Sequence, residues 1–591
     1  MRLFIQWLSL SIGGVLCGSQ VLARSFTSDN QFSNLSASPQ NGTDGQELAT
    51  RCANLRQLVP AAIKKHKIEV YVSDLHSETI SNDFFNFSAS SPNTVPFREV
   101  IPNLPKFCRF GGYFNTSSTS RVQFEVWLPL EDWSGRFAFV GNGGNSGRVN
   151  YPDMAVPLTK YKFAVASTNT GHDGMEFDGT FAISNGETRH DFGYRAVHLS
   201  TIFSKSAVKH FYGKPANKNY WLGCSSGGKQ GLKEVQAYPK DFDGVLAGAA
   251  AQWWTHLVNS CRNGWMVESN LRNSPMKEGF MNISDWALVH EHTLTQCDML
   301  DGVKDGVIDN PLVCKPTFES LQCSQVNSHK SSSSETIPPK CLTSKQISVV
   351  RSAFEDWVDG DGTFLFPSYT HGSEFFARAG MFMPAVPFPV ATDFFKYQVM
   401  NLTSVTRDNN FTSKGIIEML SVADQTDPGK CNAIDGNILP FIQRGGKLMT
   451  YTGMSDPLIP SRSSIWYHGQ VKKALGRDPR ESYRLFPVPG MGHCGGGPGA
   501  SSIGAAGQGV FPPTDMMQSS KFDSKHDMVL ALIEWTENGK APDHMIAAKF
   551  KNDQRAEGLQ FQRKLCPWPL VSKYDGRGNP NSHHSFKCQE Q

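Results

Sequence analysis

The stretch NYWLGCSSGGKQGLKEVQAYP, at residues 219–239, decides how the rest of the sequence is interpreted. It passes from an apolar run through glycines into a longer polar and apolar segment, which indicates a strand, a tight turn and a helix. Within it, G-C-S-S-G at 223–227 matches G-x-S-x-G, a motif that puts a serine on a strained turn between a strand and a helix. The stretch therefore predicts that Ser225 is a nucleophile, whereas the plainer interpretation is a glycine-rich turn without chemistry.

The segments around this stretch continue the same alternation of strands and helices. Residues 122–129 alternate like a half-buried strand, while residues 137–147 and 161–168 contain apolar runs of the buried type. Residues 191–212 carry apolar side chains at helical spacing, and residues 243–251 contain another short apolar run. Strands that alternate with helices predict an α/β fold, in which helices cover both faces of a mostly parallel sheet.

This alternation stops after these segments and returns only at the strands expected within 445–460 and 484–497. The region between them is rich in cysteine, serine and aromatic residues and is too long for a loop, so it is predicted to be a domain. We therefore expect one α/β catalytic unit made of residues 51–249 and 437–591, into which residues 250–436 are inserted.

The composition of the 591 residues is that of an ordinary globular protein, with 39% hydrophobic and 19% charged residues. The formal net charge of +3 is too small to indicate a nucleic acid or an anionic membrane surface as a partner. Apart from the N-terminal segment, no stretch is long and apolar enough to predict a membrane span.

The first 23 residues are typical of an export signal, because Arg2 precedes an apolar run that ends in the small-residue sequence VLA at 21–23. A membrane anchor is the weaker interpretation, since the apolar core is short and interrupted. Of the 13 cysteines, Cys17 would leave with the signal, and the even number that remains is expected in an oxidising compartment. A set of N-x-[ST] sequons also suits a secreted glycoprotein. Residues 24–50 are polar and are predicted to form a flexible leader.

A serine nucleophile needs a general base, and the base needs an orienting carboxylate. With a G-x-S-x-G turn, the chain order of the three is serine, acid, histidine. Among the 17 histidines, His493 stands out because it lies in the glycine-rich segment GMGHCGGG after an expected strand. Asp456 follows the expected strand KLMTYTG, so both residues would lie at carboxyl ends of strands, where open α/β sheets place their sites. Asp456 alone would more often be a turn-former, and its position in the chain order favours it as the acid.

Two cysteines adjoin the expected nucleophile and base, because Cys224 precedes Ser225 and Cys494 follows His493. If these cysteines pair, their Cα atoms would lie about 5.5 Å apart, which would bring the serine and the histidine into one neighbourhood. Such a bridge would fix the geometry of the catalytic pair, where small displacements are costly. The alternative is that both cysteines pair elsewhere.

A serine nucleophile that attacks a carbonyl group also needs N–H donors for the oxyanion of the tetrahedral intermediate. One is expected from the residue after the nucleophile, which is Ser226. Another is expected from the loop after an early strand, where VGNGGN at 140–145 offers Gly143 or Gly144. The sequence leaves open which glycine donates, and the loop by itself is also consistent with a plain tight turn.

The combination of CS at 224–225, Asp456 and HC at 493–494 resembles the tannase and feruloyl esterase family of secreted serine esterases. The resemblance extends from about residue 50 to residue 590. It implies an α/β-hydrolase fold with a large inserted lid domain, and substrates that are esters of aromatic acids such as ferulate or gallate.

The segment CDMLDGVKDGVIDNP at 297–311 resembles the calcium loop that members of this family carry in the lid. Oxygen ligands at short odd intervals, with glycines that allow sharp turns, also suit a hard cation, and the alternative is a solvated acidic turn. Asp309 is either an outer ligand or only a charge. We expect a structural Ca²⁺ and no organic cofactor. The expected ligands are the carboxylates of Asp298, Asp301 and Asp305 and the carbonyls of Val303 and Val307.

The same resemblance implies how the remaining cysteines pair, which the sequence alone does not determine. The implied bridges are Cys52–Cys108, Cys297–Cys314, Cys323–Cys341, Cys566–Cys588 and, across the base of the inserted region, Cys261–Cys431.

These features together predict a secreted esterase whose substrates are feruloyl esters of plant cell-wall polysaccharide, either as small aromatic esters or as feruloylated saccharides. A tannase acting on galloyl esters is the first alternative. The second alternative belongs to another class, namely a catalytically silent, secreted protein that binds calcium or adheres to carbohydrate. The presence of all three triad residues argues against the silent protein.

Overall fold

The computed structural model describes several stretches of the chain, which together exclude the predicted export signal and most of the predicted leader. These stretches are residues 43–64, 71–88, 97–259, 279–323, 341–377, 389–405, 413–505 and 519–591. From Gly45 to Gln591 the chain forms one unit. The division into a catalytic part and an inserted domain therefore stays a prediction.

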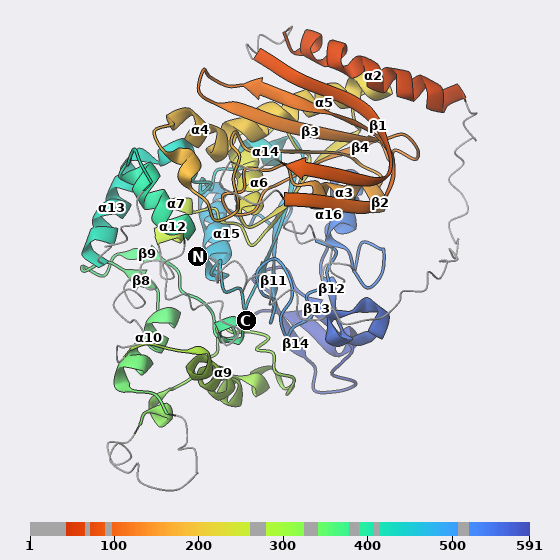
Figure 1. Ribbon diagram of the computed structural model, residues 1–591. Coiled ribbons are helices and arrows are strands. Elements are labelled where there is room, and N and C mark those ends of the chain that lie inside the picture. The colour runs from red at the N-terminus through yellow and green to blue at the C-terminus, as the bar shows by residue number, and fades with distance from the viewer. Residues whose placement is uncertain are drawn as a thin grey trace, which may run out of the picture. The chain divides into compact units, whose positions relative to one another are not determined.

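A nine-stranded sheet runs through this unit in the order β1-β2-β3-β5-β4-β6-β7-β10-β11 (Figure 1). The strands from β5 to β11 pair in parallel, and β1, β2 and β3 extend one edge of the sheet in antiparallel fashion. The α/β fold with a mostly parallel sheet is thus confirmed. The strands are β1 (Tyr71–Ser88), β2 (Phe97–Asn115), β3 (Arg121–Pro129), β4 (Arg136–Val140), β5 (Ala164–Thr168), β6 (Lys218–Cys224), β7 (Gly244–Gly248), β10 (Lys447–Gly453) and β11 (Tyr483–Val488).

The strands expected from apolar runs correspond to β3 to β7, β10 and β11, whereas the sequence analysis does not predict β1 and β2. Charged and polar residues such as Asp74, His76 and Glu78 interrupt the apolar pattern of β1. The pairing of β1 with β2 also shifts register, between Ser73 and His76 among other places. An irregular antiparallel edge lacks the continuous apolar signal of a strand that is buried on both faces.

Helices cover both faces of the sheet, and the alternation of side chains along β4 shows how. Phe137 and Phe139 lie in the core cluster on one face, while Ala138 and Val140 lie in the cluster on the other face. The first cluster is completed by α2, α5, α6 and α15, and the second by α3 and α16. These helices are α2 (Thr43–Lys64), α3 (Tyr151–Lys160), α5 (Ala196–Tyr212), α6 (Ser226–Ala237), α15 (Arg462–Leu475) and α16 (Met528–Asn538).

Helix α2 begins at Thr43, so the prediction of a flexible leader is wrong for residues 43–50. The reason lies in contacts that a local pattern does not reveal. Leu55 is fully buried against the sheet, and Cys52 forms a disulfide with Cys108 of β2. The polar sequence at the N-terminal end of α2 does not predict a helix. The helix is stabilised because its apolar face packs onto the sheet.

The segment between β7 and β10 contains short helices and a small two-stranded sheet, seen in green at the lower left of Figure 1. Its buried apolar side chains form several small clusters instead of one core. Two disulfides, Cys297–Cys314 and Cys323–Cys341, tie this segment together. The elements are α7 (Trp254–Asn259), α9 (Ile283–Cys297), α10 (Ser344–Phe354), β8 (Trp357–Val358), β9 (Phe364–Phe366), α11 (Glu374–Ala377), α12 (Pro389–Asp393) and α13 (Ser413–Thr426).

Two further α-helices and two hairpins are found in the part of the chain that the structure describes. The short helices α4 and α14 flank α5 and β10 along the chain, and the hairpins follow α16. The bridge Cys566–Cys588 joins the end of the first hairpin to the last strand of the second. These elements are α4 (Gly186–His190), α14 (Leu439–Gln443), β12 (Met545–Phe550), β13 (Leu559–Leu565), β14 (Val571–Tyr574) and β15 (Phe586–Gln589).

Five of the six expected disulfides are present, including Cys224–Cys494. Cys261 lies outside the described residues, so its expected bridge to Cys431 stays a prediction. Cys431 is buried and forms no disulfide within the described ranges.

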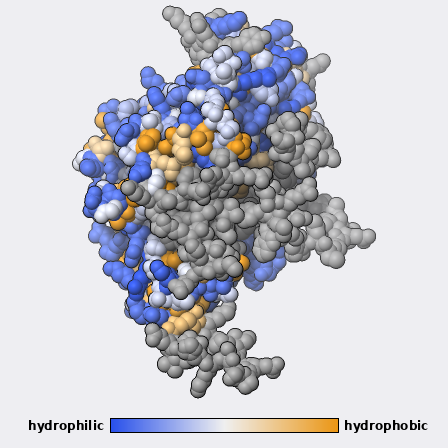
Figure 2. Space-filling model, turned by 60° about the vertical axis from the view of Figure 1, so that its left-hand side comes forward, coloured by the Kyte–Doolittle hydropathy of each residue, from blue (hydrophilic) through white to orange (hydrophobic). Residues whose placement is uncertain are grey.

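The surface outside the residues drawn in grey is mainly hydrophilic on the face shown in Figure 2, where hydrophobic residues gather only in small groups. In the part of the chain that the structure describes, no helix is both long and apolar enough to cross a bilayer.

Candidate active site

Ser225 occupies the turn between β6, which ends at Cys224, and α6, which begins at Ser226. Its backbone has φ +62° and ψ −123°, a conformation that a residue with a side chain adopts only under constraint. The turn needs small neighbours, because a Cβ atom at Gly223 would lie 2.7 Å from the carbonyl group of Gly227. The close packing of this turn therefore explains why the motif has glycines on both sides of the serine.

Backbone hydrogen bonds fix this turn to the neighbouring strand. The Ser225 N–H donates to the carbonyl of Gly248, at the end of β7, at 2.9 Å. The Ser225 carbonyl accepts from the N–H groups of Lys229 and Ala251, each at 3.0 Å. The backbone of the serine is thus held from both sides at the carboxyl end of the sheet.

His493 and Asp456 come from the loops after two adjacent strands, β11 and β10. The imidazole Nδ1 of His493 lies 2.8 Å from Oδ2 of Asp456, whose side chain is fully buried. The other carboxylate oxygen accepts from the N–H groups of Leu458 and Ile459 at 2.8 and 2.9 Å. Both carboxylate oxygens are thus engaged, so the acid has one fixed orientation from which it can hold the imidazole.

The bridge between Cys224 and Cys494 joins the serine turn to the histidine loop, with 6.1 Å between the two Cα atoms. Ser225 and His493 are covalent neighbours of the bridged residues and therefore belong to one site. No hydrogen bond joins the Ser225 hydroxyl to the imidazole in this structure. Catalytic hydrogen bonds of this kind often become short only when a substrate is bound.

The expected oxyanion loop lies against the nucleophile turn. A Cβ atom at Gly141 would lie 2.5 Å from Cα of Gly227, so the loop after β4 directly contacts the start of α6. The N–H groups of Gly143 and Gly144 donate to no other group within the described ranges. Ser226 is the first residue of α6, where N–H groups have no partner inside the helix. The loop after β4 thus lies against the start of α6, and the assignment of Ser226 and of Gly143 or Gly144 as donors stays a prediction.

A pair of side chains that the sequence analysis missed holds the oxyanion loop in place. The N–H of Asn142 donates to Oε1 of Gln230 at 3.0 Å, and Nε2 of Gln230 donates back to Oδ1 of Asn142 at 3.2 Å. The Asn142 amide also donates to the carbonyls of Arg148 and Thr168, each at 2.8 Å. Gln230 lies on α6 shortly after the nucleophile, so the helix that positions Ser225 also positions the loop.

Lys229, one turn after Ser225, is a second residue without a local signal in the sequence. Its ammonium group is buried, makes no hydrogen bond within the described residues, and lies over the rings of Trp254 at 3.9 Å and Phe192 at 4.4 Å. Burial lowers the pKa of Lys229 to about 8. A cation held over two aromatic faces carries positive charge behind the nucleophile turn.

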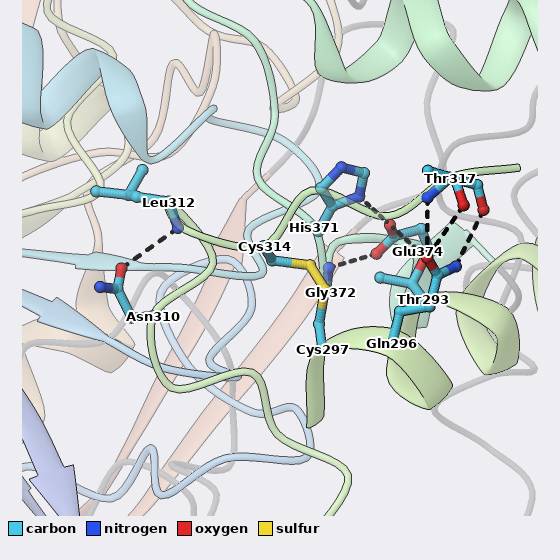
Figure 3. Close-up of a disulfide and its surroundings, with 10 residues drawn as sticks. All are labelled: Thr293, Gln296, Cys297, Asn310, Leu312, Cys314, Thr317, His371, Gly372 and Glu374. Atoms are coloured by element: carbon cyan, nitrogen blue, oxygen red, sulfur yellow. Dashed lines mark hydrogen bonds and ion pairs between the residues drawn. A yellow bond between two sulfur atoms is a disulfide. The ribbon is translucent and has the colours of Figure 1, made fainter. Parts of the chain in front are cut away.

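The expected calcium loop follows α9 and is closed by the bridge Cys297–Cys314, which Figure 3 shows with its surroundings. In each of three aspartates, one carboxylate oxygen accepts a hydrogen bond from a backbone N–H of the loop. Oδ1 of Asp298 accepts from Gly306 N–H at 3.1 Å, Oδ1 of Asp301 from Val303 N–H at 2.9 Å, and Oδ1 of Asp305 from Val307 N–H at 3.0 Å.

Other oxygens of this loop lack partners. Oδ2 of Asp301 and both carboxylate oxygens of Asp309 are buried without a hydrogen bond within the described residues. Burial, together with the charge of Asp301, raises the pKa of Asp309 well above its usual range. The Arg563 guanidinium contacts the remaining oxygen of Asp305. Buried carboxylate oxygens without donors are of the kind that Ca²⁺ takes as ligands, so the residues present suit the expected ion, and the site itself stays a prediction.

The sequence profile of the family described as "Tannase and feruloyl esterase" matches residues 108–589. A protein named "Probable feruloyl esterase B-1" from Aspergillus oryzae is 36% identical over 530 residues, which cover 89% of this chain and 92% of that relative. A "Probable feruloyl esterase B-2" from Neosartorya fischeri is 34% identical over 485 residues, which cover 81% of this chain and 86% of the relative.

Solved structures give the same picture. The crystal structure of feruloyl esterase B from Aspergillus oryzae superimposes with a TM-score of 0.76 at 32% identity and covers 92% of this chain and 100% of its own. The tannin acyl hydrolase from Aspergillus niger has a TM-score of 0.68 at 20% identity, covering 92% of this chain and 96% of its own, and it shows the fold alone. The expected α/β-hydrolase type of fold is therefore confirmed, and this chain belongs to the tannase and feruloyl esterase family of carboxylic ester hydrolases.

Proposed function

We propose that this protein is a secreted serine esterase that hydrolyses feruloyl and related hydroxycinnamoyl esters of plant polysaccharide. The observation that carries the proposal is the arrangement of Ser225 on its strained turn, joined through Cys224–Cys494 to the loop of the His493–Asp456 pair. The choice of acyl group is supported by relatives named feruloyl esterase B, which cover most of the chain.

In the acylation step, His493 takes the proton of the Ser225 hydroxyl while the serine oxygen attacks the ester carbonyl. Asp456 holds the Nδ1–H of the imidazole, so that the other ring nitrogen is free to act as the base. The imidazolium then gives its proton to the leaving alcohol, and the acyl group stays on the serine. Deacylation repeats these steps with water as the nucleophile, which releases the aromatic acid and restores the free serine.

The negative charge of each tetrahedral intermediate falls on the former carbonyl oxygen. We assign its donors to the N–H of Ser226 and to the N–H of Gly143 or Gly144. The dipole of α6 points its positive end at the same place, because the helix begins at Ser226. Donors that are held in position before the reaction lose no energy to reorganisation during it.

We assign Ca²⁺ to the loop between Cys297 and Cys314. Asp298, Asp301 and Asp305 would supply carboxylates and Val303 and Val307 carbonyls, and the burial of both carboxylate oxygens of Asp309 favours a ligand over a mere surface charge. The ion would neutralise clustered buried carboxylates and thus stabilise the loop. Its residues are not among those of the triad, so its role is structural.

Secretion is part of this proposal, because the disulfides need an oxidising compartment and the first 23 residues have the pattern of an export signal. Mass spectrometry of protein recovered from the culture medium of an expressing fungal host tests it. Secretion predicts a mature N-terminus after residue 23, and retention of the full chain inside cells would contradict it.

The proposed activity is tested with the purified protein and a panel of methyl esters of ferulic, p-coumaric, caffeic, sinapic and gallic acids. We expect higher kcat/KM values for the hydroxycinnamates than for the gallate. A preference for methyl gallate would instead identify a tannase, and no hydrolysis of any ester would identify a catalytically silent protein. The matched control is Ser225→Ala, which is expected to lose several orders of magnitude in kcat while it keeps the wild-type melting temperature.

A further inference from the structure

A cavity of about 610 Å³ lies between the inserted segment and the first half of α15. Its size is within the range of ligand-binding pockets. None of Ser225, Asp456 and His493 lines it, so it is distinct from the site of ester cleavage. Its wall combines aromatic rings with polar side chains, among them Phe354, Phe364, Trp466, Lys315, Asp356, His371 and Arg462.

The aromatic rings of this cavity are partly exposed and are held by stacking against their neighbours. Trp466 stacks on Trp253, with ring centroids 4.4 Å apart and an angle of 19° between the planes. Phe354 stacks on His371 at 4.1 Å and 29°. Phe364, on β9, is 39% exposed. Rings that are fixed in this way offer flat apolar surfaces. Because stacking already restricts them, they lose little conformational entropy when a ligand binds.

Three polar side chains of the cavity, those of Asp356, Arg462 and His371, are paired with neighbours, whereas Lys315 is exposed and forms no ion pair with the described residues. The guanidinium of Arg462 contacts the carboxylate of Asp356 through two nitrogens and donates to Oγ of Ser368 at 2.6 Å. Nδ1 of His371 lies 2.9 Å from Oε1 of the buried Glu374. Figure 3 shows the His371 ring held by this carboxylate from one side, with the other ring nitrogen directed away from it.

The cavity adjoins the loop that carries the catalytic acid. Thr370 lies in the cavity wall, and its hydroxyl group donates a hydrogen bond to the carbonyl of Met454. The same Oγ1 atom lies 3.1 Å from Oγ of Ser461. Ser373, which follows in the same segment, donates to the carbonyl of Asp456 at 3.5 Å. A ligand in the cavity would therefore be in contact with the segment that packs on the Asp456 loop.

We propose that this cavity binds the saccharide part of the ester substrate, as a neutral sugar chain. This inference rests on the proposed function, because the catalytic site would take the aromatic acyl group and the cavity the carbohydrate to which it is attached. Sugar rings present C–H groups on their faces and hydroxyls at their edges, which match aromatic planes beside polar groups. A free aromatic acid is the competing occupant, because the exposed Lys315 in the cavity wall offers its carboxylate a cation, whereas Arg462 is already paired with Asp356, and the titration below separates the two.

The kinetic test compares methyl ferulate with a feruloylated arabinoxylo-oligosaccharide as substrates of Phe364→Ser and Trp466→Ala. We expect each variant to lose about ten times more in kcat/KM on the oligosaccharide than on the methyl ester, through KM. Phe522→Ser is the matched control, because Phe522 is also an exposed aromatic residue, at 53%, but does not line the cavity. Equal losses on both substrates, or equal behaviour of Phe364→Ser and Phe522→Ser, would overturn the inference.

A binding test separates this inference from the proposed activity. The inactive Ser225→Ala protein is titrated with an unesterified arabinoxylo-oligosaccharide and, separately, with ferulate, in a calorimeter. We expect saturable binding of the oligosaccharide that weakens at least fivefold when Phe364→Ser is added. Binding of ferulate that depends on Phe364, or no binding of the oligosaccharide, would overturn the saccharide site. Wild-type protein that hydrolyses no aromatic ester would instead refute the proposed function, whatever the titration shows.

Discussion

Cys224 and Cys494 are 270 positions apart in the chain, and their disulfide places the nucleophile turn and the histidine loop side by side. The strands that carry the two loops, β6 and β11, are separated in the sheet by β7 and β10. Sheet pairing alone therefore does not bring these two loops into contact. The covalent link supplies a distance constraint that the hydrogen-bonded framework does not.

The first prediction follows from this link. The double variant Cys224→Ala/Cys494→Ala is expected to lose about a hundredfold in kcat, because a displacement of 1 Å at the reacting atoms has a cost of this size. Its sheet should persist, since both sheet faces have their own buried cores. The check is kcat on methyl ferulate, measured well below the melting temperature of the variant.

Cys566→Ala/Cys588→Ala is the matched control, because it removes a bridge that joins two C-terminal hairpins and no triad residue. It is expected to lower stability by roughly 2–5 kcal/mol while kcat in the folded state stays near that of the wild type. If the first double variant is folded and turns over substrate at the wild-type rate, its bridge does not position the catalytic pair.

The second prediction concerns the hydrogen bonds between Asn142 and Gln230. Gln230→Ala removes the acceptor of the Asn142 N–H and the donor to its side chain. The oxyanion loop then loses its link to α6, so we expect kcat to fall by about tenfold to a hundredfold with little change in KM. A stopped-flow or steady-state measurement of kcat and KM on methyl ferulate provides the check.

Gln230→Glu distinguishes positioning from simple packing, because a carboxylate keeps the acceptor for the Asn142 N–H but not the donor. We expect an intermediate kcat for this variant. Because Glu has nearly the same shape as Gln, full recovery of kcat in Gln230→Glu would point to packing and not to the donated hydrogen bond, and an unchanged kcat in both variants would show that the pair does not hold the loop for catalysis.

The third prediction concerns calcium. Elemental analysis of the purified protein should find about one Ca²⁺ per chain, and removal by a chelator should lower the melting temperature, because a ligand of the folded state stabilises it. Asp301→Asn should weaken binding in a calcium titration followed by thermal unfolding. The proposed site would be refuted if the purified protein contained no calcium and its melting temperature did not change when Ca²⁺ was added.

The fourth prediction concerns Lys229 and pH. Burial lowers the pKa of this lysine from 10.5 to about 8 in the folded protein. Between these values the unfolded chain binds the proton and the folded chain has released it, so the free energy of unfolding rises with pH in this window. Below about pH 8 both states are protonated, and the folded state carries the full cost of the buried charge.

Lys229→Met has a similar shape and no charge, so its stability should lack this pH dependence. We expect the difference in unfolding free energy between wild type and variant to change by up to about 3 kcal/mol between pH 7.5 and pH 10.5. Urea unfolding at several pH values measures it. The comparison with the variant removes the contributions of other titrating groups such as Lys233 and Asp427, which lie close enough to affect Lys229. Parallel stability curves would refute the assignment.

The sequence was sufficient for the parts of the fold that depend on local patterns. The strand, turn and helix around Ser225 follow from the glycines at 223 and 227, since only small residues allow the close approach seen there. The loops of Asp456 and His493 follow from apolar strands that end in turns. These are short-range signals, because steric demands and periodicity act between residues that are neighbours in the chain.

Other features depend on contacts between distant segments, and local patterns do not contain them. Asn142 and Gln230 have no mark that identifies them as partners before the chain folds. The burial of Lys229 against Trp254 depends on a residue beyond the next strand. Polar residues along β1 interrupt the apolar pattern by which a strand is predicted, and β1 forms because it pairs with β2. In each case the tertiary environment overrides the local preference.

The inserted segment leaves the sheet after β7 and returns to it at β10, and these two strands are direct neighbours. Its two ends are therefore attached to adjacent, paired strands of the sheet. Because β7 and β10 pair directly, a change in the length of this segment would leave the order of the strands on either side unchanged. Selection for new esters could thus act on this segment while the machinery for cleaving them stayed in place.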